Sequence, residues 1–341
     1  MRGVPSFRRM VVGLAVLCGI AVVVTVDAGG ATQADSTSPN VTSSVQQELD
    51  ALAAKARPAT FGVTVIDLKT GHHWGVNQDD ALPMMSVFKA PVAATVLDMV
   101  DRNDLSLSET VTIGRDDLRK GASDIARSFK GKRMTFTVGQ LLNAAVSHSD
   151  NTAIDALIKR IGGPDVVTRF LRTHRVEGMR VDLDEGGIER VFSGLDAGER
   201  PRRNETVKQR EMRLWRGYQA FLADPRNRST PKAAAAFLRK LWNGDLLSGA
   251  STRRLLDLMY AQTKPVRLRA GLPHGAKLAD KCGTSVSLRG MTAAFNDIGI
   301  VTLPNGHAVI IAAFLTASRA KRKERTGLFA DLTRQVAAHL R

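Results

Sequence analysis

Apolar and polar residues alternate one by one near both ends of the chain, and this period of two predicts β-strands. Residues 61–77 (FGVTVIDLKTGHHWGVN) alternate on either side of the turn Lys69-Thr70-Gly71, which is typical of a β-hairpin. Near the C-terminus, residues 296–316 hold two runs rich in β-branched residues, joined by Pro304-Asn305-Gly306. The sequence therefore predicts a sheet that takes strands from both ends of the chain.

Between these strands the apolar residues recur at helical spacing, from Pro83 to about Gly163, with breaks at glycine and aspartate. Thr137 precedes one of the periodic runs and is a good helix cap. Further helices are predicted over residues 46–56 and 328–340. Together these patterns favour an α/β (α+β) fold: an antiparallel sheet built from both termini and flanked by helices, with an inserted all-helical subdomain.

The domain boundaries follow from the same patterns. We expect one domain over residues 35–341, with an α/β part at about 45–80 and 235–341 and a helical part at about 81–234. Residues 35–45 are polar and predict a flexible lead-in to this domain. The crevice between the two parts is a natural place for a ligand.

The first 34 residues have the composition of an export signal. Arg2, Arg8 and Arg9 precede an uncharged apolar run over residues 10–26, and small residues follow it. We therefore predict a secretory signal peptide over residues 1–34 and a periplasmic location, reached by the general or the twin-arginine route. A retained anchor helix is the alternative, because the apolar run is barely long enough to span a bilayer.

The two cysteines and the strongly basic net charge limit which disulfides and which partners we expect. Cys18 lies in the predicted signal, so Cys282 is alone in the mature chain and no internal disulfide can form. The net charge of +16 would suit a nucleic-acid binder, but the basic residues are scattered and no zinc, RNA-recognition or helix-turn-helix signature is present. We expect no nucleic-acid partner, no stable membrane insertion after signal removal, and a monomer that meets anionic polymers of the cell envelope.

Ser86 and Lys89 stand three residues apart at the start of an apolar helical run. Positions i and i+3 share one face of a helix, so the Lys89 amine can reach the Ser86 hydroxyl and activate it as a nucleophile. Free N–H groups at the helix N-terminus also favour developing negative charge. The structural alternative is that Ser86 caps the helix while Lys89 extends its apolar stem along the surface.

Two further polar motifs follow, one between two helical runs and one in the C-terminal part: Ser149-Asp150-Asn151, and Lys281-Cys282-Gly283-Thr284-Ser285. The first is also explained by helix capping through Asp150, and the second by a polar turn around its glycine. Each motif alone therefore has a simple structural explanation. All three in this order, in an exported chain with terminal strands and central helices, are hard to ascribe to chance.

In these three motifs the chain resembles the class A serine β-lactamases, whose signature combines S-x-x-K with S-D-N and K-T-G. Four longer segments also resemble class A sequences: SVFKAPVAATVLDMV, LLNAAVSHSDNTAIDALIKRIGGP, RLRAGLPHGAKLADKCGTS and TAAFNDIGIVTLPNG. The resemblance runs from about residue 45 to the C-terminus. The V-S-H-S-D-N and T-A-A-x-N-D-I-G segments are similar to a branch that holds several extended-spectrum enzymes.

The resemblance implies that the chain opens the β-lactam ring of penicillins and cephalosporins through an acyl-enzyme, without a cofactor or a metal. Ser86 would attack the carbonyl, Lys89 would be its proton partner, and Ser149 would pass a proton to the leaving ring nitrogen. Backbone N–H groups of Ser86 and Thr284 would form the oxyanion hole. The substrate would be bound by residues of the second and third motifs: Asn151, Lys281, Cys282, Gly283, Thr284 and Ser285.

Hydrolysis of the acyl-enzyme needs a general base, and the family pattern places Glu185 at that position. Glu177 and Glu189 are weaker candidates, and Glu185 could instead be one of several solvent-facing acids in an acidic turn. Family members usually follow this glutamate with a Pro and, slightly later, an Asn. Here Gly186 and Gly187 follow instead, which predicts a differently shaped loop.

Three other features depart from the family pattern. Residues 189–229 form a basic insertion that enlarges the Ω-loop region, and residues 207–223 within it predict a helix. We expect this helix to pack near the Ω-loop through an apolar stripe of Met212, Leu214, Trp215, Tyr218 and Phe221. Cys282 stands where the family has a Thr or Ser hydroxyl that helps bind the substrate carboxylate, and a thiol is a weaker donor. The arginine that pairs with that carboxylate is not evident, and Arg289 is the candidate.

Two alternatives stay open at this point. A D,D-carboxypeptidase or another penicillin-binding acyltransferase shares the three motifs but needs no Ω-loop glutamate. A non-catalytic envelope-binding protein on the same fold would use the basic insertion as its working surface. The seven histidines form no metal-ligand set, so we do not expect a metal-dependent mechanism.

Overall fold

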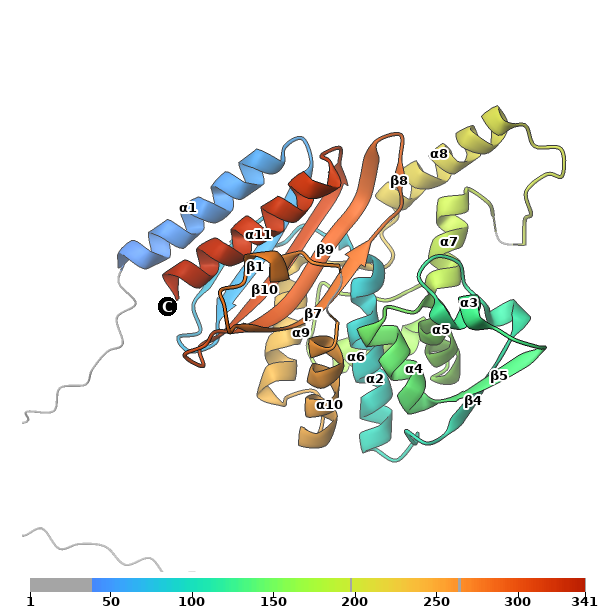
Figure 1. Ribbon diagram of the computed structural model, residues 1–341, viewed down its shortest axis with the longest axis horizontal. Helices are drawn as coiled ribbons and strands as arrows, with labels where there is room; N and C mark the ends of the chain where they lie inside the picture. Colours follow the sequence, from blue (N-terminus) through green and yellow to red (C-terminus); the bar gives the residue numbers. More distant parts are fainter. Residues whose placement is uncertain (1–38, 197, 263–264, 341) are drawn as a thin grey trace, which may run out of the picture. The chain divides into compact units, whose positions relative to one another are not determined.

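An antiparallel sheet carries the fold of the computed structural model, which describes residues 39–196, 198–262 and 265–340. The signal peptide predicted for residues 1–34 lies outside the described residues. The sheet strands are β1 (Thr60–Asp67), β2 (His73–Val76), β7 (Lys277–Thr284), β8 (Ser287–Leu288), β9 (Met291–Thr302) and β10 (Ala308–Ser318). They lie in the order β2-β1-β10-β9-β7, with β8 paired to β9 (Figure 1). The sheet thus joins strands from both ends of the chain, which confirms the predicted fold class.

Neighbouring residues of the long central strands pack into separate hydrophobic clusters on the two faces of the sheet. In β10, Val309 and Ile311 face one cluster while Ile310 and Ala312 face the other. This is the expected period of two for a strand buried on both sides. The run of β-branched residues that predicted the strand therefore supplies both faces of the core.

Two helices at the chain ends, α1 (Pro39–Ala56) and α11 (Arg322–His339), lie side by side over one face (Figure 1). Phe61 of β1 meets Phe329 of α11 edge to face, with ring centroids 5.4 Å apart. Because α1 begins at Pro39, the flexible lead-in predicted up to residue 45 is wrong for residues 39–45. Val45 is buried one turn before Leu49 in the same cluster, and this contact extends the helix toward its N-terminus.

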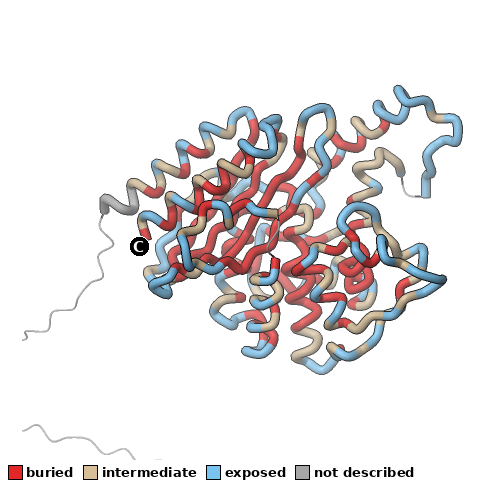
Figure 2. Tube along the Cα trace, in the orientation of Figure 1, coloured by how far each residue is buried: buried red, intermediate tan, exposed pale blue. Residues whose placement is uncertain are grey.

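Helices cover the opposite face and continue into the helical part of the fold. They are α2 (Lys89–Asp101), α4 (Val138–Ser147), α5 (Asn151–Arg160), α6 (Pro164–Thr173), α9 (Pro231–Asn243) and α10 (Gly249–Tyr260). Every residue of α2 from Lys89 to Leu97 is buried, because α4, α5, α6 and α10 pack around it. Figure 2 shows buried residues gathered along the sheet strands and these central helices. None of the helices in the described part of the chain combines the length and apolarity that crossing a bilayer requires.

The sequence predicted an all-helical inserted subdomain. A small two-stranded sheet in this subdomain shows that the prediction was wrong on this point. β4 (Thr110–Gly114) pairs antiparallel with β5 (Arg133–Thr137), and the capping box of Thr137 and Gln140 then starts α4. Both strands alternate polar and apolar residues, but each is only five residues long, and the sequence analysis assigned them to the surrounding helical pattern. The remaining short elements are β3 (Leu82–Pro83), η1 (Met85–Phe88), η2 (Arg115–Asp117), α3 (Asp124–Ser128), β6 (Arg228–Ser229) and η3 (Leu268–Gly271).

The insertion contains the predicted helix, α8 (Val207–Ala223), which packs on α7 (Glu185–Ser193). Phe192 of α7 stacks on Phe221 with ring centroids 4.1 Å apart, and Tyr218 is buried beside them. Tyr218 also donates a hydrogen bond to the carbonyl oxygen of Met291 at 2.6 Å, which fixes α8 to the main sheet. Met212 is 53% exposed and does not belong to the packed stripe, because the first turns of α8 extend beyond α7.

Candidate active site

Ser86 and Lys89 lie where the 3₁₀-helix η1 runs into α2. Lys89 is the first residue of α2, and its side chain is fully buried. Its amine donates to the carbonyl oxygen of Ser149 and to Oδ1 of Asn151, both at 2.7 Å, and lies 3.0 Å from Oε1 of Glu185. These three acceptors match the three N–H donors of an ammonium group, so Lys89 does not extend along the surface.

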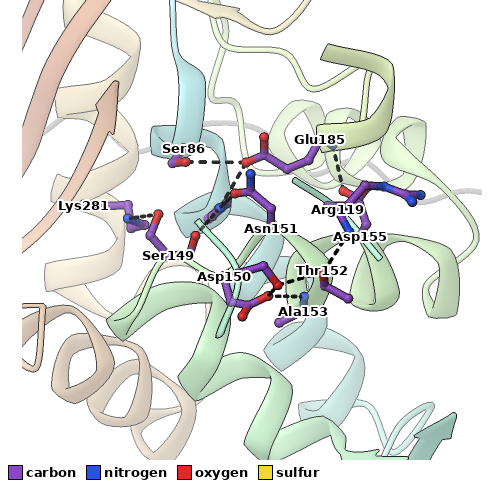
Figure 3. Close-up of polar contacts among 12 residues, drawn as sticks. Ser86, Arg119, Ser149, Asp150, Asn151, Thr152, Ala153, Asp155, Glu185 and Lys281 are labelled. Carbon is purple, nitrogen blue, oxygen red and sulfur yellow. Dashed lines mark hydrogen bonds and ion pairs between the residues drawn. The ribbon is translucent and has the colours of Figure 1, made fainter. Parts of the chain in front are cut away.

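Glu185 joins the other two groups through a single oxygen (Figure 3). The Ser86 hydroxyl donates to Glu185 Oε1 at 3.5 Å, and the same oxygen is the one that contacts the Lys89 amine. Within the described residues, Ser86 and Lys89 share no direct hydrogen bond, which differs from the contact that their spacing suggested. The hydroxyl and the amine instead meet at the carboxylate, which can accept a proton from either of them.

The two other glutamates named as candidates lie elsewhere. Glu189 pairs with Lys120 at 2.9 Å and is 42% exposed, while Glu177 is exposed. Glu185 is instead buried at the start of α7, where Asp184 caps the helix by accepting from the Gly187 N–H at 2.7 Å. Of these three acids, Glu185 is therefore the one whose carboxylate meets Ser86.

A buried aspartate, Asp155, holds the N-terminus of α7 in place (Figure 3). Its carboxylate accepts hydrogen bonds from the backbone N–H groups of Glu185 at 2.7 Å and Gly186 at 3.0 Å, and from Arg119 Nε at 2.5 Å. Burial, followed by repulsion from Asp184, raises the pKa of the Asp155 carboxyl to about 6. The sequence analysis missed this role of Asp155, and its signal was the position of Asp155 four residues after Asn151, on the same face of one helix.

The second motif connects α4 to α5 and directs its three side chains differently. Ser149 has a left-handed backbone, φ +58°, and its carbonyl oxygen faces Lys89. Asp150 is the cap of α5 and accepts from the Ala153 N–H at 2.9 Å, as its structural explanation predicted. Asn151 bonds Lys89 through Oδ1, so Ser149 and Asn151 are the members that reach the first motif.

Lys281 brings the third motif into the same place, from the buried strand β7. Its amine donates to Ser149 Oγ at 3.2 Å and also to Gln262 Oε1. Burial, followed by repulsion from Lys89, lowers the pKa of the Lys281 amine, although the neighbouring Cys282 acts in the opposite direction. The structure thus places groups from all three motifs around Ser149.

Gly283 allows β7 to approach η1. A Cβ atom on Gly283 would lie 2.3 Å from the carbonyl oxygen of Met84 and 3.1 Å from the Val87 nitrogen. No side chain can be accommodated at the first of these distances without moving the backbone. The glycine is therefore explained by close packing against the segment that carries the nucleophile.

The remaining residues of the third motif differ in whether a ligand can reach their side chains. The thiol of Cys282 is buried, 3.7 Å from Gln262 Oε1, and burial raises its pKa. The hydroxyl of Ser285 is engaged between the main chains of Ala294 and Val286. Thr284 is exposed at the end of the strand, where its hydroxyl can meet a ligand.

The arginine next to Thr284 is Arg267, whereas Arg289 lies on the β8–β9 hairpin above Trp215, 4.9 Å from the ring centroid. Arg267 is buried, with its guanidinium 3.8 Å from the Phe295 ring centroid. It donates to Thr284 Oγ1 and, at 2.9 Å, to the Gly283 carbonyl oxygen. The sequence analysis missed Arg267, and its signal was the R-L-R segment just before β7.

Comparison with known proteins agrees with this geometry. A family model described as the beta-lactamase enzyme family matches residues 44–340. The chain belongs to the β-lactamase enzyme family. This β-lactamase is 30% identical to beta-lactamase VEB-1 of Pseudomonas aeruginosa over 284 residues, which are 82% of this chain and 85% of the relative.

Solved structures extend the comparison. The crystal structure of a beta-lactamase from Chitinophaga pinensis is similar to this β-lactamase with a TM-score of 0.73 and 32% identity, covering 86% of this chain and 99% of that chain. An ancestral class A β-lactamase gives a TM-score of 0.70 at 32% identity, with the same coverage of both chains. The resemblance to the class A enzymes is confirmed, and the chain is an enzyme of this type.

Proposed function

We propose that the chain is an exported hydrolase that opens the β-lactam ring of penicillins and cephalosporins through an acyl-enzyme on Ser86. The observation that carries this proposal is the position of Glu185 Oε1, 3.5 Å from the Ser86 hydroxyl and 3.0 Å from the Lys89 amine. A penicillin target needs a nucleophile and its proton partner, whereas turnover also needs a base that directs water at the ester. A carboxylate beside both groups supports hydrolysis over the carboxypeptidase alternative.

In acylation, the Ser86 hydroxyl loses its proton to the Lys89–Glu185 pair, and its oxygen bonds to the β-lactam carbonyl carbon. The backbone N–H groups of Ser86 and Thr284 stabilise the oxyanion that forms. When the ring C–N bond breaks, Ser149 gives its proton to the nitrogen. The Lys89–Glu185 pair then passes the proton taken from Ser86 to Ser149, so Glu185 is again a carboxylate before deacylation begins. Lys281, which donates to that same hydroxyl at 3.2 Å, stabilises the developing negative charge on Ser149.

Substrate binding divides between the two sides of Ser149. The substrate carboxylate would lie at the end of β7, held by Lys281, Arg267 and the Thr284 hydroxyl. Charge-assisted hydrogen bonds of this kind are the stronger ones in proteins. Asn151 would hold the acylamide on the opposite side, while its Oδ1 keeps Lys89 in place.

Deacylation uses the base that acylation has left next to the ester. Glu185 takes a proton from a water molecule, and the resulting hydroxide attacks the acyl carbon on Ser86. The hydrogen bonds that the first two N–H groups of α7 donate to the Asp155 carboxylate keep the Glu185 side chain in reach of that carbon. The ester C–O bond then breaks, and Ser86 recovers its proton from Glu185.

The test compares Glu185→Gln with the parent enzyme in nitrocefin turnover and in mass spectrometry with benzylpenicillin. We expect turnover to fall by about 10²–10⁴, the usual contribution of a general base. An adduct on Ser86 should persist for minutes in the variant and clear in the parent. Glu177→Gln, which alters an exposed glutamate, is the matched control and should behave like the parent.

Other outcomes would point to the alternatives. Undiminished turnover in Glu185→Gln would refute the assigned base. An adduct that persists in the parent enzyme would favour a penicillin-binding acyltransferase, and the absence of any adduct would favour a non-catalytic envelope protein. Export is tested separately by fractionating cells that produce the chain with and without residues 1–34, where we expect periplasmic activity only with this segment.

A further inference from the structure

Gln262 is a buried glutamine that the proposed mechanism does not use. It lies two residues after the end of α10, is 1% exposed, and reaches β7 because α10 packs on that strand. Its side-chain oxygen, Oε1, accepts a hydrogen bond from the Lys281 amine, which is the group that also donates to Ser149. The same oxygen accepts from the Cys282 thiol at 3.7 Å. Gln262 therefore contacts two residues of the third motif from the protein interior.

The partners of the Gln262 amide fix its orientation. The amide nitrogen, Nε2, donates to the Asp280 carboxylate at 2.7 Å and to the Asp280 carbonyl oxygen at 3.2 Å. Arg269 Nη2 donates to the other carboxylate oxygen of Asp280 at 2.6 Å and to the Gln262 carbonyl oxygen at 2.8 Å. A flipped amide would turn its N–H groups toward the Lys281 ammonium and its oxygen toward the Asp280 carboxylate. The acceptor oxygen of Gln262 is thus held toward Lys281.

The three N–H donors of the Lys281 ammonium group are matched by three acceptors. They are Gln262 Oε1, Ser149 Oγ at 3.2 Å and the Cys282 carbonyl oxygen at 3.3 Å. The Lys281 side chain is fully buried, and burial lowers the pKa of its amine. With two N–H groups engaged by Gln262 and Cys282, the third is directed at Ser149 (Figure 3).

We propose that Gln262 is a positioning residue for acylation, which holds the Lys281 ammonium group in the orientation that donates to Ser149. The inference rests on the proposed function, because it needs Ser149 to give its proton to the ring nitrogen. An ammonium group held in this way stabilises negative charge on Ser149, whereas a neutral or turned amine does not. Deacylation uses Glu185 instead. Loss of the Gln262 acceptor should therefore slow acylation and leave deacylation unchanged.

The experiment compares Gln262→Met with Gln262→Glu. Methionine has about the same length and is readily buried, but it offers Lys281 only a weak acceptor. A carboxyl group introduced next to Asp280 must share a proton with it, because two adjacent buried carboxylates do not both ionise. In this state it donates to Asp280 and presents an oxygen to Lys281, as the amide does. Packing alone would favour methionine, so a positioning role and a packing role predict opposite orders of activity.

Rapid-quench mass spectrometry with benzylpenicillin gives the rate constants for formation and loss of the Ser86 adduct. Near pH 6 we expect adduct formation to slow about 10–100-fold in Gln262→Met, the range for a lost hydrogen bond to a charged group. Gln262→Glu should lie between Gln262→Met and the parent. Adduct loss should stay at the parent rate in both variants. An unfolded fraction does not alter these rate constants, because they describe the protein that reacts.

The pH dependence of adduct formation provides a second readout. The ionisable groups that act on the Lys281 amine are Lys89 of α2, Asp280 and Cys282 of β7, and Asp297 of β9. Gln262→Met replaces none of them but removes an acceptor from the protonated amine. The decline of the acylation rate at high pH, where the amine loses its proton, should therefore move to lower pH in this variant. An unmoved decline would indicate that Gln262 only fills space, which would overturn the positioning role.

Gln219→Met is the matched control, because Gln219 is an exposed glutamine of α8. It should form and clear the adduct at the parent rates. Formation at the parent rate in Gln262→Met, or slower formation in Gln262→Glu than in Gln262→Met, would overturn the positioning role while leaving the proposed function intact. Adduct loss slowed as much as adduct formation would do the same. A parent enzyme that forms no adduct would overturn both proposals.

Discussion

Replacing Asp155 with alanine should separate positioning of the base from its chemistry. Asp155 is buried, lies on α5 and contacts neither Ser86 nor Lys89. Its carboxylate instead accepts the N–H groups of the first two residues of α7 and an Arg119 N–H. Because Glu185 is the first of these α7 residues, loss of the acceptor should release the base from the nucleophile while both side chains remain present.

The size of the effect follows from the lost bonds. A buried N–H left without an acceptor costs about 1–3 kcal/mol, so two of them cost about 2–6 kcal/mol as long as α7 keeps its place. The N-terminus of α7 can avoid this cost by moving toward water. If the shift is favoured by about 3 kcal/mol, Glu185 stays in position in roughly one molecule in a hundred, since about 1.4 kcal/mol corresponds to a factor of ten. Deacylation should then slow about a hundredfold.

The assay is mass spectrometry of enzyme mixed with benzylpenicillin and sampled over seconds to minutes. We expect the Ser86 adduct to accumulate in Asp155→Ala, with a far-UV circular dichroism spectrum like that of the parent. Asp165→Ala is the control, because Asp165 is an exposed aspartate of α6 paired with an arginine on the same helix. A variant that clears its adduct at the parent rate would refute the positioning role of Asp155.

The raised pKa of Asp155, about 6 through burial and then Asp184, adds a dependence of stability on pH. The carboxyl of an unfolded chain titrates near pH 4, so the folded protein holds this proton more tightly. The resulting contribution to stability is present below about pH 4 and is lost as the pH rises through 6, with a size of about 3 kcal/mol. The Asp155→Asn side chain cannot titrate. In urea unfolding, the free energy of unfolding at pH 4 minus that at pH 7 should therefore be less positive, or more negative, for Asp155→Asn than for the parent. Equal differences in the two proteins would contradict the assignment.

Three further predictions concern β7 and Arg267, which contacts the end of that strand. Gly283→Ala should lower both the Tm and the turnover number, because the new methyl group meets the Met84 carbonyl oxygen. Thermal unfolding and nitrocefin kinetics measure these two quantities. An unchanged Tm would show that η1 can move aside. Arg267→Ala should lower kcat/KM for benzylpenicillin by about 10–100-fold, the range for a lost charge-assisted hydrogen bond. Steady-state kinetics measure this change. Equal kcat/KM values in the variant and the parent would show that Arg267 does not bind the substrate carboxylate. In a Cys18→Ser protein, the buried Cys282 thiol should react slowly with a disulfide reagent until the protein is unfolded, and rapid reaction of the folded form would contradict its burial.

Local sequence patterns predicted the parts of the fold and site that depend on neighbours in the chain. The period of two identified β1, β2, β9 and β10 but not β7, and the spacing of Ser86 and Lys89 located the junction between η1 and α2. Asp155 and Arg267 were missed because their importance arises only when separate segments meet. The pair β4–β5 was missed although both segments alternate polar and apolar residues, because a run of five residues is too short to stand out from the helical pattern on either side.

The burial of Lys89 has a consequence for how the chain gains activity during folding. Its amine is held by acceptors from the α4–α5 junction and from α7, while the lysine itself belongs to α2. An amine removed from water without these acceptors would be strongly destabilised, so the three segments must dock together rather than in succession. Covalent labelling of Ser86 by a penicillin would therefore report complete assembly of the helical part, and partly folded intermediates should remain unlabelled.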